Sequence, residues 1–384
     1  MPYEHYVVSI NLRKILHYRK VYKKRILNNF MRYTNTQLLS SLLSQGRINA
    51  NNLEEILDIS IKRVRPNIDK IEGMLLGVAI GDSLGNAIEL IDPNIRLRRY
   101  GSIEDYVSSL GGKRMGFPSD DTQLTFDTVK VILEDGYLNP EKLAKTFFSH
   151  EIYGIGISTS EVRDRYLRGM KWYECGVKSA GNGALMRISP VILPSLKGDE
   201  NHLVDAVLDT IITHNDALAI GTSIAFAELF RNLVTSVNED FLANLPERIF
   251  RFVGNRYYKV RIPNANLYEL LTREIDKALK RDEDTLTFCE RVGSEAYLGE
   301  TLPCVLFIVK KFREKPQRAI LEAANYTWDS DTIASIVGAI MGAIYGKSAF
   351  RKEWIDGLSG RLLINGKDGV IFEMIDEVKS WLSS

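Results

Sequence analysis

The sequence predicts an all-α protein, and two observations support this prediction. Period-two alternation of apolar and polar residues, which marks a half-buried strand, is rarely sustained, whereas helical periodicity recurs along most of the 384 residues. Two apolar stretches also carry a glycine at every fourth position, which places each set on a single helix face. Because glycine costs a helix about 1 kcal/mol relative to alanine, these rows indicate helices that pack too closely for side chains. The glycines are Gly73, Gly77, Gly81 and Gly85 in the first stretch and Gly338, Gly342 and Gly346 in the second.

The expected elements follow in chain order. A basic N-terminal extension over 1–69 precedes the main domain, 70–384, where the glycine-rich apolar sequence begins. Within the extension, residues 51–67 are helix-like and end at Pro66, since proline stops a helix. Within the main domain, helical periodicity predicts helices over 122–136, 205–214, 224–234, 267–281 and 333–346.

Composition restricts the class of protein. The 45% hydrophobic and 26% charged residues are ordinary for a globular protein. We expect no membrane span, because no apolar run reaches the roughly 18–20 residues needed; the run over 333–346 has the length of a core helix. The cysteines Cys175, Cys289 and Cys304 form no CxxC pair, so neither a disulfide framework nor a zinc site is indicated. With no recognisable signal peptide, the sequence favours a reducing, cytoplasmic location.

Two oxygen-rich stretches, FPSDDTQLTF over 117–126 and YTWDSDTIAS over 326–335, head apolar helical sequence. Either could simply cap a helix, because Ser and Asp accept hydrogen bonds from the first turn and acids suit its positive end. Taken singly, capping is the more frequent role. If the two starts converge, however, four carboxylates crowd one place, and like charges so close require a compensating cation. Oxygen ligands of this kind suit Mg²⁺, Mn²⁺ or Ca²⁺ and not zinc.

The sequence therefore predicts a two-metal centre with ligands from both stretches. The six predicted ligands are Ser119, Asp120, Asp121, Asp329, Asp331 and Thr332. Two further acids, Asp82 and Glu89, lie in the first glycine-rich stretch, seven residues or two helical turns apart on one face. Asp82, within apolar sequence, is typical of a buried carboxylate whose hydrogen bonds are satisfied. Glu89, at the end of that stretch, is expected to reach a cleft and to transfer a proton.

Three pieces of sequence are candidates for binding. SAGNGALMR over 179–187 presents a glycine–asparagine–glycine turn at 181–183 ahead of helical sequence, where backbone N–H groups can bind an anion. The same GNG sequence is also an ordinary turn. YGIGIS over 153–158 is a second glycine-containing turn. His214 ends an apolar helix, where a histidine is typically packed or capping, and it could also donate to a diphosphate.

These pieces, in this order, resemble the ADP-ribosylglycohydrolase family, which includes the dinitrogenase-reductase-activating glycohydrolases and the ADP-ribosylarginine hydrolases. The resemblance covers about residues 71–350, and the joint order and spacing of the motifs are specific although each is weak alone. It rests on GMLLGVAIGDSLGNAIE, SDDTQ, YGIGIS, GNGALMRISP, TH and DSDTIASIVGAIMGAIYG. The resemblance implies an all-α orthogonal multi-helix bundle with a binuclear Mg²⁺ or Mn²⁺ site.

The resemblance also implies a role for each matching residue. The metal ligands correspond to Ser119, Asp120, Asp121, Asp329, Asp331 and Thr332, and the catalytic residues to Glu89 and Asp121. The positions that bind the diphosphate and ribose of ADP-ribose correspond to Gly154, Gly156, Ser179, Gly181, Asn182, Gly183 and His214. The implied reaction is hydrolysis of the N- or O-glycosidic bond at ribose C1″ of an ADP-ribosylated protein, with arginine the favoured side chain. Such hydrolysis passes through an oxocarbenium-like transition state.

One position departs from the family pattern. The family usually has two glycines, or a glycine and a small residue, before the second metal motif, where this chain has Thr327 and Trp328. A bulky indole beside Asp329 could narrow the site, stack on the substrate or weaken catalysis. Since all ligand-type residues are retained, the sequence favours an active enzyme.

The basic extension has no counterpart in the minimal family domain. The first 50 residues contain nine Lys/Arg residues and one acid, a net charge of +8, which leaves −7 for the rest of a chain with net charge +1. Four interpretations are open: a solvated helical segment packed on the core, a surface for nucleic acid or membrane, a mitochondrial presequence, and an arm that binds a partner. The nearly neutral protein disfavours nucleic acid and membrane, and Glu4 and the aromatic residues disfavour a presequence.

The family resemblance favours the last of these interpretations. Some relatives are immunity proteins against ADP-ribosyltransferase toxins, so the arm would bind such a toxin while the main domain removes the modification. Two functions therefore stand: a metal-dependent hydrolase that acts on ADP-ribosylated protein, and an immunity protein that blocks a toxin through its arm with weak or no hydrolysis. The predicted metal ligands favour the first function, and the basic arm favours the second.

Overall fold

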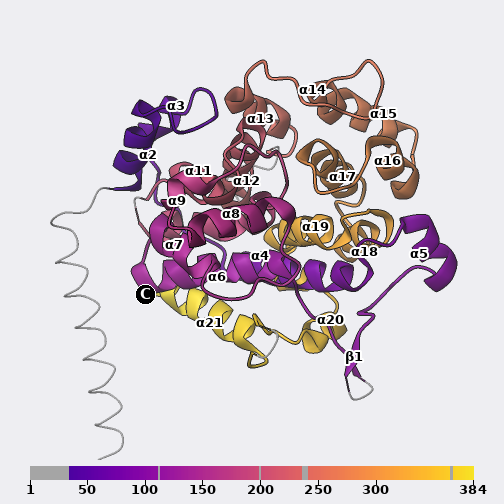
Figure 1. Cartoon of the computed structure of the whole chain (residues 1–384). Coiled ribbons are helices and arrows are strands. Elements are labelled where there is room, and N and C mark those ends of the chain that lie inside the picture. The colour runs from indigo at the N-terminus through magenta and orange to yellow at the C-terminus, as the bar shows by residue number, and fades with distance from the viewer. Residues whose placement is uncertain (1–33, 111–112, 199, 236–240, 364–365) are drawn as a thin grey trace, which may run out of the picture.

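The computed structural model describes residues 34–110, 113–198, 200–235, 241–363 and 366–384. Within these ranges the regular secondary structure is almost entirely helical (Figure 1), which confirms the predicted all-α class. The strands in these ranges, β1 (Ser109–Leu110) and β2 (Lys113–Arg114), pair antiparallel at the edge of the molecule. The basic segment 1–33 lies outside the described residues.

The first half of the chain carries the first glycine row and the first oxygen-rich stretch. Its elements are α2 (Asn35–Ser44), α3 (Glu54–Leu57), α4 (Ile68–Gly85), the 3-10 turn η1 (Asn86–Ile88), α5 (Pro93–Tyr100), α6 (Asp120–Asp135), α7 (Pro140–Phe147), α8 (Ile157–Leu167) and α9 (Trp172–Cys175). The GNG turn then leads into η2 (Leu185–Arg187), η3 (Ser189–Ile192), α10 (Leu193–Lys197), α11 (His202–Thr213) and α12 (Ala217–Thr235).

The second half of the chain carries the second glycine row and the second oxygen-rich stretch. Its elements are α13 (Leu245–Val253), α14 (Leu267–Glu269), the π-helical η4 (Leu270–Glu274), α15 (Ile275–Lys280), α16 (Thr285–Val292), α17 (Leu298–Lys311), α18 (Pro316–Tyr326), α19 (Ser330–Tyr345), η5 (Gly346–Ala349), α20 (Lys352–Gly357) and α21 (Val370–Ser383). The five helices predicted in the main domain correspond to α6, α11, α12, the α14–η4–α15 segment and α19.

Helices α4 and α19 pack against each other along their glycine rows, in opposite directions, in the middle of the molecule (Figure 1). A Cβ atom on Gly77 would lie 2.1 Å from the carbonyl oxygen of Gly338, and one on Gly338 would lie 2.2 Å from that of Gly77. No side chain fits at such distances, so glycine permits direct backbone contact. At the end of α4, Gly85 lies in the same way against Ser330 and Asp331. This contact, the glycine seam, therefore brings the end of α4 to the first turn of α19.

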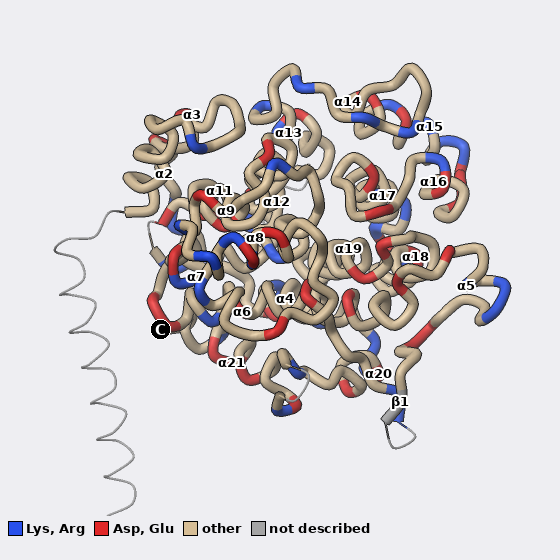
Figure 2. Tube along the Cα trace, in the orientation of Figure 1, with Lys and Arg blue, Asp and Glu red and all other residues tan. Residues whose placement is uncertain are grey.

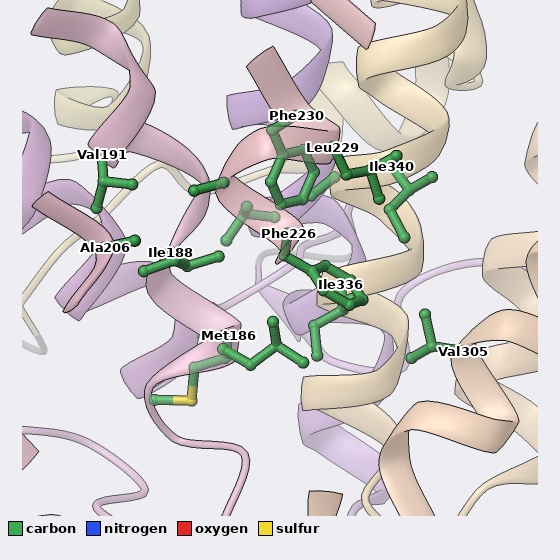
Figure 3. Close-up of a cluster of buried hydrophobic side chains, with 14 of the residues drawn as sticks. Met186, Ile188, Val191, Ala206, Phe226, Leu229, Phe230, Val305, Ile336 and Ile340 are labelled. Carbon is green, nitrogen blue, oxygen red and sulfur yellow. The ribbon is translucent and has the colours of Figure 1, made fainter. Parts of the chain in front are cut away.

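Apolar side chains from the surrounding helices close the core around α19. Figure 3 shows side chains of α12 between the η2–η3 segment and α19. The labelled residues are Met186, Ile188, Val191, Ala206, Phe226, Leu229, Phe230, Val305, Ile336 and Ile340, and all are buried. Asp331 is the only charged residue of α19 (Figure 2). Because burying an isolated charge is costly, an acid at the start of this helix needs a compensating partner.

Among the described residues, three helices are long and apolar enough by composition to cross a membrane, contrary to the expectation that no run reaches that length. They span Ile68–Ile88, Ala217–Thr235 and Ser330–Ala349. The expectation counted uninterrupted apolar residues, whereas scattered glycines, serines and single acids lower the mean hydropathy only slightly. The most apolar windows of these helices are 83%, 78% and 78% buried inside the fold, so their hydropathy reflects positions in the core.

The segment before α4 packs on the main domain. Asn35, at the start of α2, donates from Nδ2 to the carbonyl oxygen of Leu138 (2.8 Å) and to Oδ1 of Asp205 (2.6 Å). Leu39 and Leu42 of the same helix are buried. Residues from 34 onward are therefore part of the folded body, while the domain boundary near residue 70 stays a prediction.

The helix-like segment predicted over 51–67 is wrong in extent. Only α3, four residues long, is helical there, and residues 58–67 are irregular. The sequence over 59–64 is rich in β-branched residues, which lose side-chain freedom in a helix. Pro66 also disfavours helical backbone in the residue before it, so the helix that begins at the acidic residues of α3 does not continue.

Candidate metal centre and anion-binding loops

The first oxygen-rich stretch begins α6, and a carboxylate from α4 holds its first turn. Asp82 accepts hydrogen bonds from the backbone N–H of Ser119 (2.8 and 3.0 Å to its two oxygens) and of Thr122 (3.1 Å). It also accepts from Ser119 Oγ (2.8 Å) and Thr122 Oγ1 (2.5 Å). Asp82 is thus a buried carboxylate with satisfied oxygens, as its apolar sequence context indicates, and it caps α6 from a different helix.

The second oxygen-rich stretch begins α19, at the end of the glycine seam. Ser330 Oγ donates to the carbonyl oxygen of Gly85 (3.0 Å), which fixes the start of α19 on the end of α4. Thr332 Oγ1 donates to Oδ2 of Asp121 (3.2 Å). This bond joins the two oxygen-rich stretches directly, so the convergence that the metal hypothesis requires is present.

The side chain at the N-cap position caps neither helix. Ser119 and Asp329 occupy the N-cap positions of α6 and α19, yet within the described structure neither side chain makes a capping hydrogen bond. The first turn of α6 is satisfied instead by Asp82. In α6, a tertiary contact thus satisfies N–H groups that a local side chain usually satisfies. In α19, Oδ1 of Asp331 accepts a hydrogen bond from the backbone N–H of Thr332 (2.9 Å), so a local acid does serve the first turn there.

Glu89 joins the acidic cluster from beyond the end of α4. The helix ends at Gly85, and η1 leads to Glu89, whose backbone is extended at φ −53° and ψ 152°. The expectation that Asp82 and Glu89 share one helix face is therefore wrong, because the helix does not reach Glu89. Carboxylate oxygens of Glu89, Asp329 and Asp331 all lie within 4.8 Å of one another. The two acids of this stretch thus lie on different sides of the centre: Asp82 contacts the start of α6, and Glu89 lies close to the acids at the start of α19.

Burial and mutual repulsion keep the clustered acids from ionising together. Burial, and then the charges of neighbouring acids, raise the pKa of Asp120 and of Asp121 well above its usual range. Burial also raises the pKa of Asp331 and of Glu89, with Asp329 the next cause in both cases. Oδ1 of Asp121 is buried without a hydrogen-bond partner among the described residues. A divalent cation would compensate these charges and occupy such an oxygen.

The donors around the cluster fit hard divalent cations. The six predicted ligands lie at the opposed starts of α6 and α19, and all six are buried. Asp329 and Asp331 belong to the close group with Glu89. Asp120 and Asp121 lie outside that group. Asp121 is connected to it through Thr332, which donates from Oγ1 to Asp121 and from its backbone N–H to Asp331. The donor atoms are carboxylate and hydroxyl oxygens, which Mg²⁺, Mn²⁺ and Ca²⁺ prefer.

The GNG turn lies against the second oxygen-rich stretch. Asn182, which is buried, donates from Nδ2 to Oδ2 of Asp329 (2.6 Å) and to Oγ1 of Thr301 (3.0 Å). Gly181 pairs with Tyr297 in an isolated antiparallel bridge that holds the turn on the start of α17. Asn182 therefore connects the turn predicted to bind a diphosphate with a carboxylate of the candidate metal centre.

His214 and Ser179 lie next to the two glycines of the GNG turn. A Cβ atom on Gly181 would lie 3.2 Å from His214 Nε2 and 3.2 Å from Ser179 Oγ, and one on Gly183 would lie 3.1 Å from His214 Cε1. The glycines thus leave room for the imidazole and the hydroxyl beside the turn. Ser158 Oγ donates to Ser179 Oγ (2.9 Å), which connects α8 to the same site; the sequence interpretation had not singled out Ser158.

The second glycine turn lies beside the first oxygen-rich stretch. Gly154 adopts φ +80°, a conformation that favours glycine, and a Cβ atom there would lie 3.2 Å from Oδ1 of Asp120. Gly156 is extended at the N-cap of α8, with open space around a Cβ atom. The structure therefore gathers the GNG turn, the second glycine turn and His214 around one acidic centre.

Arg96 is a buried arginine that the sequence does not single out. It is 1% exposed. Its Nη2 donates to the carbonyl oxygens of Ile91 (2.9 Å) and Thr327 (3.3 Å), and its Nη1 donates to that of Ala324 (2.5 Å). One guanidinium thus joins the segment after Glu89 to the segment before Asp329. No local pattern reveals such a role, because the carbonyls of Ala324 and Thr327 are more than 200 residues away.

Trp328, the departure from the family pattern, is half-buried beside Asp329. Its backbone N–H donates to Oγ of Ser294 (2.9 Å), and the backbone N–H of Asp329 donates to the carbonyl oxygen of Ser294 (2.9 Å). Ser294 therefore holds the backbone of this segment at a point where the family usually has small residues. The effect of the indole on activity stays a prediction.

Comparison with known proteins places this geometry in one family. A family model described as ADP-ribosylglycohydrolase matches residues 64–380. A protein of Archaeoglobus fulgidus is 28% identical over 316 residues, which cover 80% of this chain and 97% of that relative. The ADP-ribosylarginine hydrolase Tri1 of Serratia proteamaculans is 25% identical over 335 residues, 81% of each chain. A solved structure described as an ADP-ribosylglycohydrolase-related protein complex shares the fold, with a TM-score of 0.60 at 21% identity over 83% of this chain and 98% of its own. Since the family model covers most of its length, the chain belongs to the ADP-ribosylglycohydrolase family and is a glycosidic hydrolase that removes ADP-ribose.

Proposed function

We propose that the enzyme hydrolyses the bond between ADP-ribose and an arginine side chain of a modified protein, with two divalent cations, Mg²⁺ or Mn²⁺, bound between the starts of α6 and α19. The observation that carries the proposal is the convergence of two buried oxygen-rich helix starts with Glu89, whose carboxylate lies within 4.8 Å of those of Asp329 and Asp331. The arginine linkage is supported by the likeness to a relative named an ADP-ribosylarginine hydrolase.

The side chains at the two helix starts offer buried oxygen atoms that could bind the cations. The proposed ligands are Ser119, Asp120, Asp121, Asp329, Asp331 and Thr332. The Ser119 hydroxyl donates its proton to Asp82, so the lone pairs of its oxygen remain available to a cation. When bound, the cations would supply positive charge that holds the ribose hydroxyls and favours ionisation of a water molecule.

Glu89 is the proposed residue for proton transfer. It is half-buried, follows a short turn outside α4, and reaches the carboxylates at the start of α19. Burial and Asp329 raise its pKa, so this carboxyl group holds a proton nearer to neutral pH than an exposed glutamate does. Asp121 is the second proposed catalytic carboxylate. Negative charge on these groups would stabilise the positive charge that develops on the ribose ring in the transition state.

The loops around the centre are proposed to bind the rest of ADP-ribose. The GNG turn and His214 would contact the diphosphate, since backbone N–H groups and an imidazole can donate to it. A Cβ atom on Gly154 would lie 3.2 Å from Oδ1 of Asp120, and this proximity supports a contact between the second glycine turn and the ribose. The proposed contact residues are Gly154, Gly156, Ser179, Gly181, Asn182, Gly183 and His214.

Release of ADP-ribose from defined peptides tests the proposal. Peptides mono-ADP-ribosylated on arginine and on serine are incubated with the protein in Mg²⁺, in Mn²⁺ and in EDTA, and free ADP-ribose is quantified by mass spectrometry. We expect metal-dependent release from the arginine peptide, slow release from the serine peptide, and loss of activity in Asp120→Ala/Asp331→Ala. Release from serine alone would overturn the arginine assignment. Equal release in EDTA would overturn the metal centre.

We also propose a second function, immunity to an ADP-ribosyltransferase toxin through the basic arm. It is supported by the net charge of +8 in the first 50 residues against −7 in the remainder, a distribution typical of an interaction arm. The proposed compartment is the cytoplasm, in keeping with three free, buried cysteines.

Deletion of residues 1–33 tests the arm. Residues from 34 onward are retained because α2 packs on the main domain. We expect the truncated protein to lose binding to an ADP-ribosyltransferase toxin, measured by biolayer interferometry, while its hydrolase activity stays at the level of the full chain. Toxin binding that survives the deletion would refute this role for the arm.

A further inference from the structure

A buried arginine, Arg187, contacts both parts of the proposed diphosphate site. It follows the GNG turn in the sequence, and its side chain is 0% exposed. Nη1 donates to the carbonyl oxygen of Gly183 (2.5 Å), and Nη2 donates to Oγ1 of Thr213 (2.9 Å). The guanidinium lies 3.0 Å from Oδ1 of Asp209, which is equally buried. The ion pair balances the charge, and Nη2 also donates to the carbonyl oxygen of Asp209 (3.0 Å). The hydrogen bonds to Gly183 and Thr213 are directed at the GNG turn and at the residue before His214.

The hydrogen bonds of Thr213 determine which nitrogen of His214 carries the proton. Arginine has donors only, so Oγ1 of Thr213 must accept the hydrogen bond from Arg187. The other group recorded at hydrogen-bond distance from this hydroxyl, within the described residues, is Nδ1 of His214 at 2.8 Å. The oxygen has a second lone pair, but if it also accepted from Nδ1, the buried hydroxyl proton would lack an acceptor among the described residues, which is costly. The hydroxyl proton is therefore donated to Nδ1. A neutral imidazole that accepts at Nδ1 carries its proton on Nε2.

The Nε2 side of the ring lies against the GNG turn. Its distance from a Cβ atom on Gly181 would be 3.2 Å, and the neighbouring Cε1 would lie 3.1 Å from one on Gly183. Burial, and then the charge of Arg187, lower the pKa of His214 to about 3, so the ring is neutral at physiological pH. A neutral ring donates from a single nitrogen, and the choice of tautomer therefore decides whether His214 can donate toward an anion at this turn.

We propose that Arg187 and Thr213 are positioning residues, which fix the GNG turn and hold His214 in the tautomer with the proton on Nε2, so that the ring donates a hydrogen bond to the diphosphate of ADP-ribose. This inference rests on the proposed function, because the diphosphate is its ligand. It extends that function by assigning the donor atom and the two residues that select it. If Arg187 and Thr213 had a purely structural role, they would not determine which nitrogen of His214 carries the proton.

Nuclear magnetic resonance of ¹⁵N-histidine-labelled full-length protein tests the tautomer. Long-range ¹H–¹⁵N correlations distinguish a proton on Nε2 from one on Nδ1, and the His214 signals are assigned by their loss in His214→Gln. We expect the Nε2–H form in the parent and in Thr213→Ser, which keeps the hydroxyl. We expect a mixture of tautomers in Thr213→Val. Thr210→Val is the matched control, because Thr210 is buried one turn earlier on α11 and donates to the carbonyl oxygen of Ala206 (2.7 Å).

Isothermal titration with ADP-ribose measures the consequence for binding. We expect Thr213→Val to bind ADP-ribose about three- to tenfold more weakly than the parent, as expected for partial loss of one hydrogen bond to a charged group. Thr213→Ser and Thr210→Val should bind like the parent. A parent with the proton on Nδ1, or a Thr213→Val variant with unchanged tautomer and affinity, would overturn the inference. A parent with the Nε2–H form that fails to bind ADP-ribose would instead overturn the proposed function, since the tautomer is read without ligand.

Discussion

Asp82 shapes the acidic centre although its own oxygens are occupied. They accept hydrogen bonds from the backbone and hydroxyl groups of Ser119 and Thr122, which satisfies the first turn of α6. The two acids that follow, Asp120 and Asp121, are thereby spared from capping. Burial raises the pKa of Asp82 to about 6 even though these hydrogen bonds lower it. A carboxylate beside the centre thus combines a structural task with a sensitivity to pH.

Replacing Asp331 with asparagine removes one charge from the cluster and keeps the shape of the side chain. Without metal, the variant should be more stable than the parent by about 1–3 kcal/mol, because like charges repel strongly in a buried site. With Mg²⁺, the parent should gain stability and the variant should not, since binding to the folded state stabilises it. Thermal unfolding with and without Mg²⁺ measures both effects. Asp276→Asn, at an exposed acid of α15, is the control; a full Mg²⁺ shift in Asp331→Asn would contradict the assignment of Asp331 as a ligand.

At the residue scale, chemistry that is written into a short motif could be predicted, and chemistry that depends on distant partners could not. Asp329 and Asp331 stand at a helix start in the sequence, and the structure brings them within 4.8 Å of Glu89. Arg96 and Arg187 stand in sequence that gives no sign of burial. Their positions are set by backbone carbonyls and by Asp209 from other segments, which periodicity along the chain cannot reveal.

At the scale of elements, the glycine seam positions the candidate metal centre. Backbone contact between Gly77 and Gly338 fixes the separation and register of α4 and α19. Register matters because Gly85 meets the first turn of α19 at the end of the seam. A change of one residue in either glycine row would therefore move the carboxylates of α19 relative to Asp82 and Glu89.

Gly77→Ala tests the seam. The added Cβ would lie 2.1 Å from the carbonyl oxygen of Gly338, and we expect a loss of about 2–3 kcal/mol in the free energy of unfolding, as for overpacked cores. Urea unfolding measures the loss, and Mg²⁺ titration should show weaker binding because α19 is displaced. Gly198→Ala is the matched control, since the nearest atom to its Cβ would be 3.8 Å away. Equal midpoints for the two variants would contradict a close backbone contact.

Element boundaries could be predicted where packing and periodicity agree. The rows of glycines indicated a close helix pair, and α4 and α19 form it. The prediction failed where a tertiary or local constraint intervened. Helix α4 ends at Gly85, so Glu89 lies beyond the helix and does not share a face with Asp82. Irregular backbone over 58–67 likewise replaced a predicted helix, since amphipathic spacing alone does not outweigh β-branched residues and proline.

At the scale of the whole molecule, the buried acids link stability to pH. The folded pKa of Asp82, about 6, exceeds its ordinary value of 3.8. Between these values the folded state binds more protons than the unfolded state, so the free energy of unfolding falls as the pH rises. For this group alone the loss is on the order of 3 kcal/mol. Its contribution to stability is greatest below about pH 4 and is lost above about pH 6.

Metal should reverse this dependence on pH. We expect the stabilisation by saturating Mg²⁺, measured as the change in thermal midpoint relative to EDTA, to grow as the pH rises from about 4 through 6, because protons and cations compete for the same carboxylates. The expected sign follows from pKa values that are raised throughout the cluster. A stabilisation by Mg²⁺ that shrinks over this interval would show that the cation binds elsewhere.

The glycine seam also predicts how the molecule opens. Helices held backbone to backbone cannot part through the rotation of a side chain, so α4 and α19 should separate only when the whole domain unfolds. Hydrogen–deuterium exchange should find the amides of these helices among the slowest, and those of α5 and of the irregular segment over 254–266 among the faster ones. Fast exchange in α19 at a rate independent of global stability would contradict this.

The order of opening affects how long the centre keeps its shape. We expect α5 and residues 254–266 to fluctuate while the carboxylates at the end of the glycine seam remain on the most persistent part of the fold. Turnover would then require motion only of segments outside the glycine seam. The missing side chains of a few glycines would thus make the candidate metal centre the most durable part of the enzyme.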